Sequence, residues 1–440
     1  MWGYYLRLAL RSSGRSRALT WLVIVLIGCG VATCMVCYAV FRVTTGDPIP
    51  SRSARLFVPQ VDNFGPGKYG SGEPPVTLSY TDAMAVARST LAEHHALIYG
   101  ATWVVEPGDE RVQPIATGGD AVTADFFPMF AVPFAYGSAW TASDDTGRAA
   151  VVVIGRKLNE RLFAGKNSVG RSLQLDGRAY RIVGVLDAFN PRPRFFDVAS
   201  QGPLSAFEDA GQVFVPFNRA IDVRKAPQYD YCSAVAPGAG DWQGYLRGEC
   251  NWISAWVDLP TAAGVERYRD YLQAYAAEQQ RSGRFAWAPN VRLHGLMEWM
   301  SIIHVVPKAS SLSMLVSFSF LVVALVNVIG LMLARFMRRA PEIGVRRALG
   351  ASKRAIGAQF LIEAALVGAA GGVFGVILTM LGTWGVDGLF ESGIARLVRI
   401  DAGLLALTLL VAVMVTVLAA IYPVWRATAI QPGWQVKING

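Results

Sequence analysis

RRAPEIGVRRALGASKR, residues 338–354, is a basic stretch between two long apolar runs. Seven Lys or Arg lie between residues 335 and 354, against a single acid, Glu342. A loop this basic and this close to two membrane spans is expected on the cytoplasmic side of a membrane. The stretch therefore predicts a membrane protein and sets the direction in which its spans run.

The composition agrees with this interpretation. Hydrophobic residues make up 53% of the 440 residues and charged residues 17%. Because a helix needs about 20 apolar residues to cross a bilayer core, we searched for such runs and found four, at residues 18–41, 309–336, 356–386 and 402–425. The fold class expected is a four-helix membrane protein. The first span is expected to be a retained anchor, because its apolar run exceeds the roughly 7–15 residues of a signal peptide.

The formal charge divides between the two sides of these spans. The segments at 1–20, 335–354 and 426–437 together carry a net charge of +12, whereas the whole chain carries +9, so the remainder carries −3. We expect residues 1–17 to form a cytoplasmic amphipathic helix, 337–355 a cytoplasmic coupling segment, and 426–440 a cytoplasmic tail. Residues 387–401 would then be a short outer loop. Basic residues concentrated beside a membrane favour contact with lipid over nucleic-acid binding.

Residues 42–308 predict a large folded α+β domain outside the cytoplasm, inserted between the first two spans. Strands and helices alternate at both ends of this domain, at about 50–105 and 250–305. They predict one βαβ-type subdomain. The segment at about 106–249 is rich in short strands and predicts a second subdomain inserted into the first.

Individual elements of this domain have local signatures. Apolar spacing predicts a helix over 79–95, capped by Ser79 or Thr81. Asp176-Gly177 predicts a hairpin turn between strands at 169–175 and 180–186. The remaining elements expected are strands at 96–105, 151–154, 213–216, 253–259 and 285–288, and helices at 156–163, 262–280 and 291–306.

Five cysteines divide into two groups. Cys29, Cys34 and Cys37 lie in the first span and predict apolar packing. Cys232 and Cys250 lie in the external domain, where disulfides persist. A bond between them would stabilise the fold by about 3 kcal/mol in the chain-entropy model. Two unpaired thiols in a mobile insertion are the alternative.

Motifs for catalysis are absent from the sequence. Gly165-Lys166-Asn167 lacks the glycine spacing and the hydroxyl residue of a Walker A motif. GPGKYG, at 65–70, follows no clear strand and predicts a linker. His94 and His95 are expected to end a helix, where basic groups suit the helix dipole. We predict no catalytic, cofactor-binding or metal-binding residue on this chain, and no ATP hydrolysis by it.

The third span contains the polar exception and a cluster of small residues. Glu363 is its one charge, and intramembrane ionisable groups are functional candidates. Since Glu363 follows the basic segment by about two helical turns, a packing or interfacial role is the other interpretation. The same span allows close backbone approach, and we expect tight helix packing, with a dimer seam as one place for it, at Gly368, Gly371, Gly372 and Gly375.

Five blocks of the chain carry a family resemblance, at residues 6–11, 122–130, 151–186, 342–352 and 422–427. In these blocks the chain resembles the permeases of the MacB/FtsX-like family of ABC transporters. EIGVRRALGAS, at 342–352, is the most specific of them. Two departures are Ala340-Pro341, where the family has further Arg, and QPGW at 431–434 in the tail.

The resemblance implies a dimer of permeases, of identical or related chains, with ABC ATPase subunits docked below it in a bacterial inner membrane. ATP and Mg²⁺ would be held by the ATPase, expected on a separate chain, which would push the cytoplasmic segment and move the external domain. The residues implied to contact the ATPase are Glu342, Ile343, Gly344, Val345, Arg346, Arg347, Ala348, Leu349 and Gly350.

Three hypotheses follow for the output of that motion. The first is efflux with a periplasmic adaptor and an outer-membrane channel. The second is envelope regulation, by activating a peptidoglycan hydrolase or releasing lipoproteins. The third, a membrane-anchored sensor without an ATPase, is disfavoured because anchoring needs only charge and does not need the specific order at 342–352.

Overall fold

The structure is a computed structural model that describes residues 17–68, 72–106, 113–201, 203–233, 238, 240–305, 308–385 and 401–429. The chain forms two compact units. The helical unit comprises residues 1–45 and 307–440, and the inserted α/β unit comprises residues 46–306. The predicted helix at 1–16, the loop at 387–400 and the tail beyond 429 lie outside the described residues.

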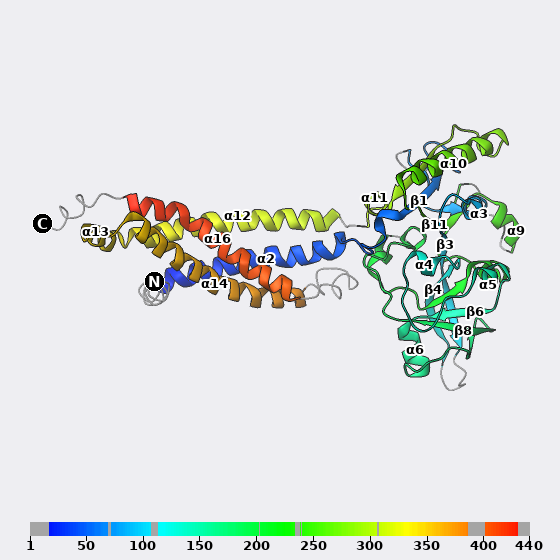
Figure 1. The fold of residues 1–440 in the computed structure, drawn as a ribbon, viewed down its shortest axis with the longest axis horizontal. Coiled ribbons are helices and arrows are strands. Elements are labelled where there is room, and N and C mark those ends of the chain that lie inside the picture. The colour runs from blue at the N-terminus through cyan, green and yellow to red at the C-terminus, as the bar shows by residue number, and fades with distance from the viewer. Residues whose placement is uncertain are drawn as a thin grey trace. The chain divides into compact units, whose positions relative to one another are not determined.

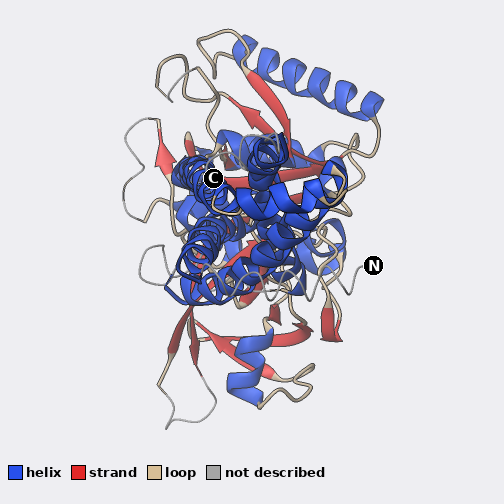
Figure 2. Cartoon of the chain, turned by 90° about the vertical axis from the view of Figure 1, so that its left-hand side faces the viewer, coloured by secondary structure: helices blue, strands red, loops and turns tan. Residues whose placement is uncertain are grey.

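Four long apolar helices build the helical unit, as the sequence predicts. Each has at least 27 residues and is long and apolar enough to cross a membrane. In the bundle, α14 packs against α2 and α16, and α12 packs against the same two helices (Figure 1). Figure 2 shows them end-on. The four are α2 (Arg17–Thr45), α12 (Lys308–Met337), α14 (Lys353–Gly385) and α16 (Ala402–Ala429).

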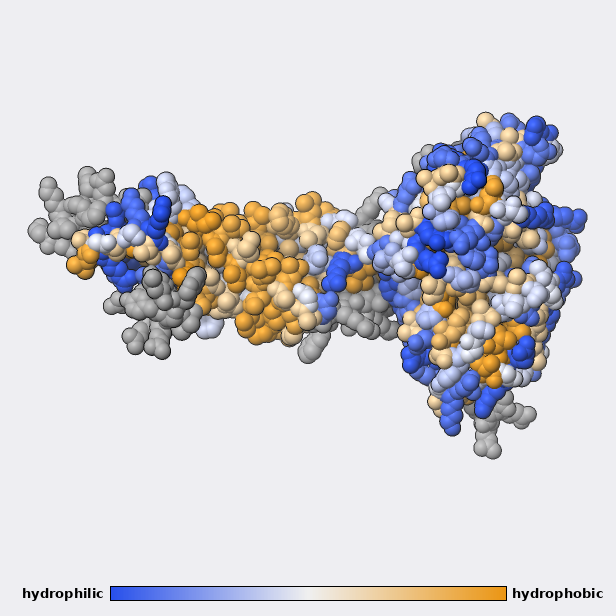
Figure 3. Space-filling view, in the orientation of Figure 1, coloured by the Kyte–Doolittle hydropathy of each residue, from blue (hydrophilic) through white to orange (hydrophobic). Residues whose placement is uncertain are grey.

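The outer surface of this bundle is apolar (Figure 3). Leu315 and Val326 of α12, for example, are more than half exposed. Four buried threonines inside the bundle donate to the carbonyl four residues earlier in their own helix, so their hydroxyls are satisfied without a partner helix. These pairs are Thr379 to Gly375, Thr408 to Leu404, Thr416 to Ala412 and Thr428 to Val424.

The inserted unit is a twelve-stranded sheet with short helices on it. The strands are β1 (Leu56–Val61), β2 (Leu78–Ser79), β3 (His95–Glu106), β4 (Ile115–Val122), β5 (Phe134–Gly137), β6 (Val151–Ile154), β7 (Ser172–Leu175), β8 (Arg178–Leu186), β9 (Val213–Pro216), β10 (Tyr231–Cys232), β11 (Cys250–Asp258) and β12 (Val291–Gly295). The helices are α3 (Tyr80–Arg88), α4 (Phe126–Met129), α5 (Ala142–Thr146), α6 (Arg156–Phe163), α7 (Val198–Gln201), α8 (Phe217–Asp222), α9 (Trp242–Arg247), α10 (Ala262–Arg281) and α11 (Leu296–Ile302), with 3-10 turns at Ser53–Arg55 and Pro203–Phe207.

The strands run in the order β12-β1-β11-β3-β4-β9-β6-β8-β5. β4 pairs with β9, and β6 with β8, in parallel, while the other neighbours on this path are antiparallel. The strands of the two predicted subdomains thus join in one sheet, at the pairings of β3 with β4 and β7 and of β10 with β11.

β11 lies at the centre of the core. All nine of its residues are buried, which is typical of a strand covered on both faces. The ring of Trp252 packs edge-on against Tyr99 at 4.7 Å between centroids. Trp256 packs edge-on against Phe195 at 5.3 Å, and its indole N–H donates to the Phe196 carbonyl.

Elements with strong local signals are where the sequence places them. Strand 151–154 and helix 156–163 are β6 and α6. Asp176 and Gly177 both have positive φ, at 48° and 73°, so the β7–β8 hairpin has the turn that the dipeptide favours.

Three predicted elements are wrong. The helix expected over 79–95 is capped by Ser79 but ends at Arg88, because the following residues turn to enter β3 and Glu93 N–H donates to the Asp258 carbonyl. His94 and His95 therefore do not end a helix. The strand expected at 285–288 is a loop, and the helix expected over 291–306 is β12 followed by α11, because β12 completes the sheet beside β1.

One buried acid of this unit gives stability a pH dependence. Asp145, in α5, accepts the backbone N–H groups of Ala124 and Asn218 at 3.2 and 3.3 Å. Burial nevertheless raises the pKa of Asp145 to about 6, above its usual value of 3.8. The folded state therefore holds a proton more tightly than the unfolded state, so this group favours folding at low pH and loses that contribution as pH rises from about 4 to 6.

Asp145→Asn is expected to remove this dependence. Relative to the variant, the wild-type chain should lose about 3 kcal/mol of unfolding free energy between pH 4 and pH 7, for a pKa shift of about two units. Urea titrations followed by tryptophan fluorescence measure it. The neighbouring Asp144 is the control, because its contribution to stability should depend on pH in the opposite direction. Hydrogen bonds from Thr141 lower the pKa of Asp144. Parallel profiles for wild type and Asp145→Asn would contradict the assignment.

Candidate functional site

The motif at 342–352 folds as a short amphipathic helix, α13 (Ala340–Ala348), between α12 and α14. Pro341 lies in its first turn, where a missing N–H leaves no donor unpaired. The Ile343 side chain is buried in the apolar core of the bundle, and α13 packs against α16. One side of α13 is thereby attached to the bundle.

The opposite side of α13 is open. Val345 is 61% exposed and Leu349, in the turn that closes the helix, is 83% exposed. They lie four residues apart, and with exposed Glu342 they line one face. Because large apolar side chains on a short polar helix bury little against their own chain, this face is suited to contact a partner.

The arginines of the motif point back to the bundle. Arg346 donates to Gln359 of α14 at 3.0 Å and pairs with Glu342. Arg347 donates to the Thr428 carbonyl of α16 at 3.3 Å. The basic residues of the motif therefore hold α13 in place, while the exposed surface is largely apolar.

A buried ion cluster lies behind α13. The Glu363 carboxylate, on α14, bonds to Arg335 of α12 and, at 2.9 Å, to Arg339, which directly precedes α13. Glu363 is 1% exposed and Arg335 2%. Two guanidinium groups around one carboxylate satisfy its oxygens, as a charge removed from water requires. Sequence reasoning singled out Glu363 but missed both partners, since they lie on another helix at a separation no local pattern reports.

Comparison with known proteins identifies the family of the chain. Residues 20–275 match the MacB-like periplasmic core domain, and residues 314–432 match the FtsX-like permease C-terminal domain. The chain belongs to the MacB/FtsX-like family of ABC transporter permeases. As the family and the four apolar helices indicate, it is a multi-pass membrane protein.

The chain is similar in sequence to members of two groups of export proteins. A "Pyoverdine export ATP-binding/permease protein PvdT" of Pseudomonas putida is 26% identical over 344 residues, which is 75% of this chain and 45% of the relative. A "Macrolide export ATP-binding/permease protein MacB" of Wolinella succinogenes is 26% identical over 63% of this chain and 36% of the relative. The permease thus spans less than half the length of these relatives.

Among solved structures, the periplasmic region of MacB from Actinobacillus actinomycetemcomitans aligns with a TM-score of 0.37 and 12% identity. The alignment covers 59% of the permease and 96% of that region.

The four glycines of α14 are used inside the permease. A Cβ on Gly368 would lie 2.8 Å from Thr416 of α16, and one on Gly372 would lie 2.9 Å from Leu409. A Cβ on Gly371 would lie 3.1 Å from Ile27 of α2, and Gly375 faces the backbone of Gly28. Small residues let these helices approach closely. Both faces of α14 that carry these glycines are thus packed against the chain's own helices.

The structure joins Cys232 and Cys250, which pairs β10 with β11. With Asp230 they form the one group of potential metal-ligand atoms found among the described residues, but the two sulfurs are bonded to each other. In the first span, Cys34 is buried and Cys29 and Cys37 are half-buried.

Glu363→Gln is expected to destabilise the helical unit. The substitution leaves Arg335 buried with a neutral partner, and breaking a buried pair from one side costs about 3–5 kcal/mol. Thermal unfolding of the detergent-solubilised permease measures the loss. Asp401→Asn is the control: it breaks the exposed ion pair with Arg42 and keeps a cap for α16, so it should have little effect. Equal effects of the two substitutions would rule out a special role for the buried cluster.

Gly368→Leu should destabilise the bundle as well, by overpacking against α16. Forcing extra carbons into a packed interface costs about 1–3 kcal/mol. Gly330→Leu in α12 is a matched control, because a Cβ there meets nothing within 4 Å. The melting temperature of the Gly368 variant should fall while that of the Gly330 variant stays at or above wild type, and the reverse order would contradict the packing described.

Proposed function

We propose that this permease is driven by an ABC ATPase that docks on α13, and that ATP-driven movement of the helical unit moves the inserted α/β unit and exports a substrate. The observation that carries the proposal is the two-sided character of α13: one side is fastened to the bundle by Ile343 and Arg347, and the other presents Val345 and Leu349. A helix so held transmits a push to the helices behind it.

The composition of the spans favours a bundle that moves, and not one that conducts the substrate through its centre. Among their described residues, the charged side chains buried between the helices are Arg335 and Glu363, which neutralise each other. Buried threonines bond to their own helices. So few buried polar side chains, among the described residues, do not resemble the lining of a water-filled path, so the substrate would be expelled by the α/β unit and not drawn through the bundle.

A second permease is proposed to cover α12. Asn327, near the middle of α12, is exposed on the bundle surface, and α12 is the least buried of the four spans. A polar side chain is unfavourable in hydrocarbon unless a neighbouring helix satisfies it. The partner would be a copy of this chain or a related permease. We place the assembly in a bacterial inner membrane with α13 and both termini in the cytoplasm, where the basic residues belong.

Export is favoured over envelope regulation by the relatives, whose names describe pyoverdine and macrolide export. An export system of this kind would use a periplasmic adaptor and an outer-membrane channel. Genes beside this one distinguish the two roles: an ATPase with an adaptor supports export, whereas a hydrolase or a lipoprotein chaperone supports regulation.

Val345→Glu combined with Leu349→Glu tests the docking face. The double variant should lose co-purification with the ATPase encoded beside this gene and lose stimulated ATP hydrolysis by at least tenfold, because two carboxylates would be buried in an apolar contact. Neither residue is needed to hold α13 on the bundle, so the melting temperature should be unchanged.

Ala355→Glu is the matched control. Ala355 is exposed in the first turn of α14, where an acid is tolerated by the helix dipole. That variant adds negative charge to the same segment and should bind the ATPase as wild type does. Retained binding and hydrolysis in the Val345/Leu349 variant would refute docking on this face.

A further inference from the structure

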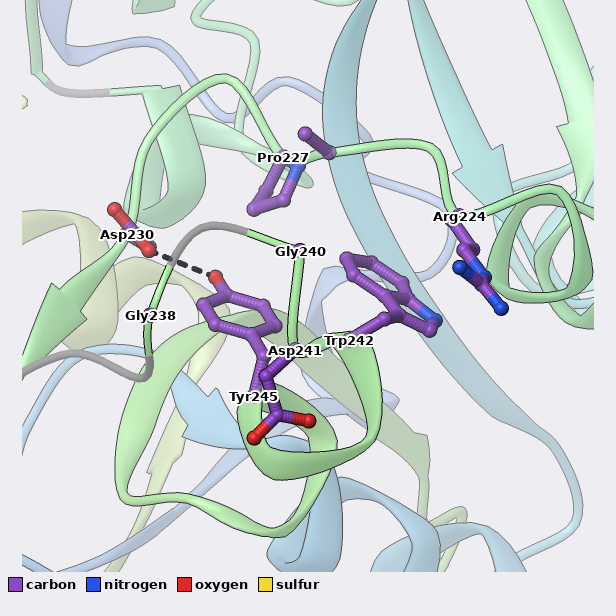
Figure 4. Close-up of a pocket in the computed structure, with 9 residues that line it drawn as sticks. Arg224, Pro227, Asp230, Gly238, Gly240, Asp241, Trp242 and Tyr245 are labelled. Atoms are coloured by element: carbon purple, nitrogen blue, oxygen red, sulfur yellow. Dashed lines mark hydrogen bonds between the residues drawn. The ribbon is translucent and has the colours of Figure 1, made fainter.

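A pocket of about 360 Å³ opens in the inserted α/β unit between α8 and α9 (Figure 4). Its size falls within the range of about 300–1,000 Å³ that small-molecule sites occupy. Aromatic, apolar and charged side chains converge on it, which is the usual composition of such sites. The six side chains that matter for recognition are Arg224, Pro227, Asp230, Asp241, Trp242 and Tyr245.

Two aromatic rings form one wall of the pocket. Trp242 and Tyr245 stack at 5.5 Å between centroids and 19° between planes. Buried Trp252 of β11 supports both, at 6.4 and 5.7 Å. The Trp242 indole N–H donates to the Ile221 carbonyl at 3.1 Å, which fixes the ring. Figure 4 shows Pro227 beside the two rings, so an apolar body has surfaces to pack on.

Two carboxylates lie on either side of Tyr245, Asp230 at its hydroxyl and Asp241 near its backbone (Figure 4). Asp230 Oδ2 accepts the Tyr245 hydroxyl at 2.8 Å, and Asp241 Oδ1 caps α9 by accepting Gly244 N–H at 2.8 Å. Among the described residues nothing donates to Asp230 Oδ1 or Asp241 Oδ2. Burial raises the pKa of Tyr245, and the Asp230 carboxylate raises it further, so the hydroxyl stays a donor and the carboxylate stays an acceptor.

Among the described residues that line the pocket, the cation is Arg224, at the other end. Arg224 lies beyond the indole of Trp242 in Figure 4, away from both carboxylates. The six side chains therefore carry a net charge of −1 with the negative part beside an aromatic ring. A carboxylate near aromatic side chains attracts ammonium groups through its charge, and the rings add the cation–π attraction.

The disulfide makes this arrangement rigid. Asp230 lies two residues before Cys232, whose bond to Cys250 attaches β10 to β11. Trp252, which supports the aromatic wall, follows two residues after Cys250 on the same strand. A site held in its binding geometry loses little entropy when a ligand enters.

We propose that this pocket binds an organic cation that carries an apolar body. Its ammonium group lies against Asp230 beside the Tyr245 hydroxyl, with Asp241 adding negative charge at the same wall, and its apolar part packs on Trp242 and Pro227. The inference does not depend on the ATPase or on export, because binding here involves the α/β unit alone.

A series of probes that differ only in charge tests the proposal. The full chain in a neutral detergent is titrated with 4-fluorophenethylamine, 2-(4-fluorophenyl)ethanol and 4-fluorophenylacetate, with fluorine NMR as the readout. The amine should bind at least tenfold more tightly than the alcohol and the acetate. Equal affinities, tightest binding of the acetate, or no saturable binding of the amine at millimolar concentration would overturn the proposal.

Asp230→Asn combined with Asp241→Asn should weaken amine binding at least tenfold and leave alcohol binding unchanged. Asparagine still accepts from Tyr245 and still caps α9, so the fold should persist, and an intact Cys232–Cys250 bond checks this. Glu266→Gln with Asp270→Asn, two exposed acids of α10, gives the same change in net charge elsewhere on the unit and should bind as wild type. An unchanged affinity in the pocket variant would also overturn the proposal, and the probe series decides it even where that variant fails to fold.

Discussion

The carboxylate of Glu363 lies within a membrane helix and out of contact with water, and this placement constrains the helices around it. A charge there is stable only with its partners in contact, so α12 must bring Arg335 and Arg339 against α14. Arg339 is also the residue from which α13 starts. The ion cluster thus fixes the end of one span against the beginning of the next and, through them, the position of α13.

Around this cluster the bundle is held by close packing. Lipid tails are as apolar as leucine, so helices in a membrane gain little from hiding apolar surface and much from close backbone approach. The glycines of α14 serve this on two sides, toward α2 and toward α16. A helix that contacts two neighbours so closely cannot shift without them.

The motif at 342–352 and the inserted unit show which features of the structure the local sequence pattern predicts and which it does not. The composition of residues 338–354 indicates a basic segment between two spans, but in the structure its arginines face inward to Gln359 and Thr428 while its valine and leucine face out. In the inserted unit, the hairpin at Asp176-Gly177 is encoded by two residues whose positive φ the turn requires. The helix after Ser79 is cut short because its last residues are needed beside β11, a strand some 160 residues further on, and the strand expected at 285–288 is displaced to 291–295 by pairing with β1.

The sequence by itself determined the four spans, their charge asymmetry, the family motif and the short elements whose signals are local, because apolar length, charge and turn chemistry act over a few residues. Only the tertiary structure decided which arginines contact Glu363 and which face of α13 is exposed. It decided that the glycines of α14 pack against other helices of the same chain. It also decided that an aromatic pair from α9 and a carboxylate beside the disulfide line one pocket. These depend on residues brought together across long separations by packing, and no periodicity in the chain records such contacts.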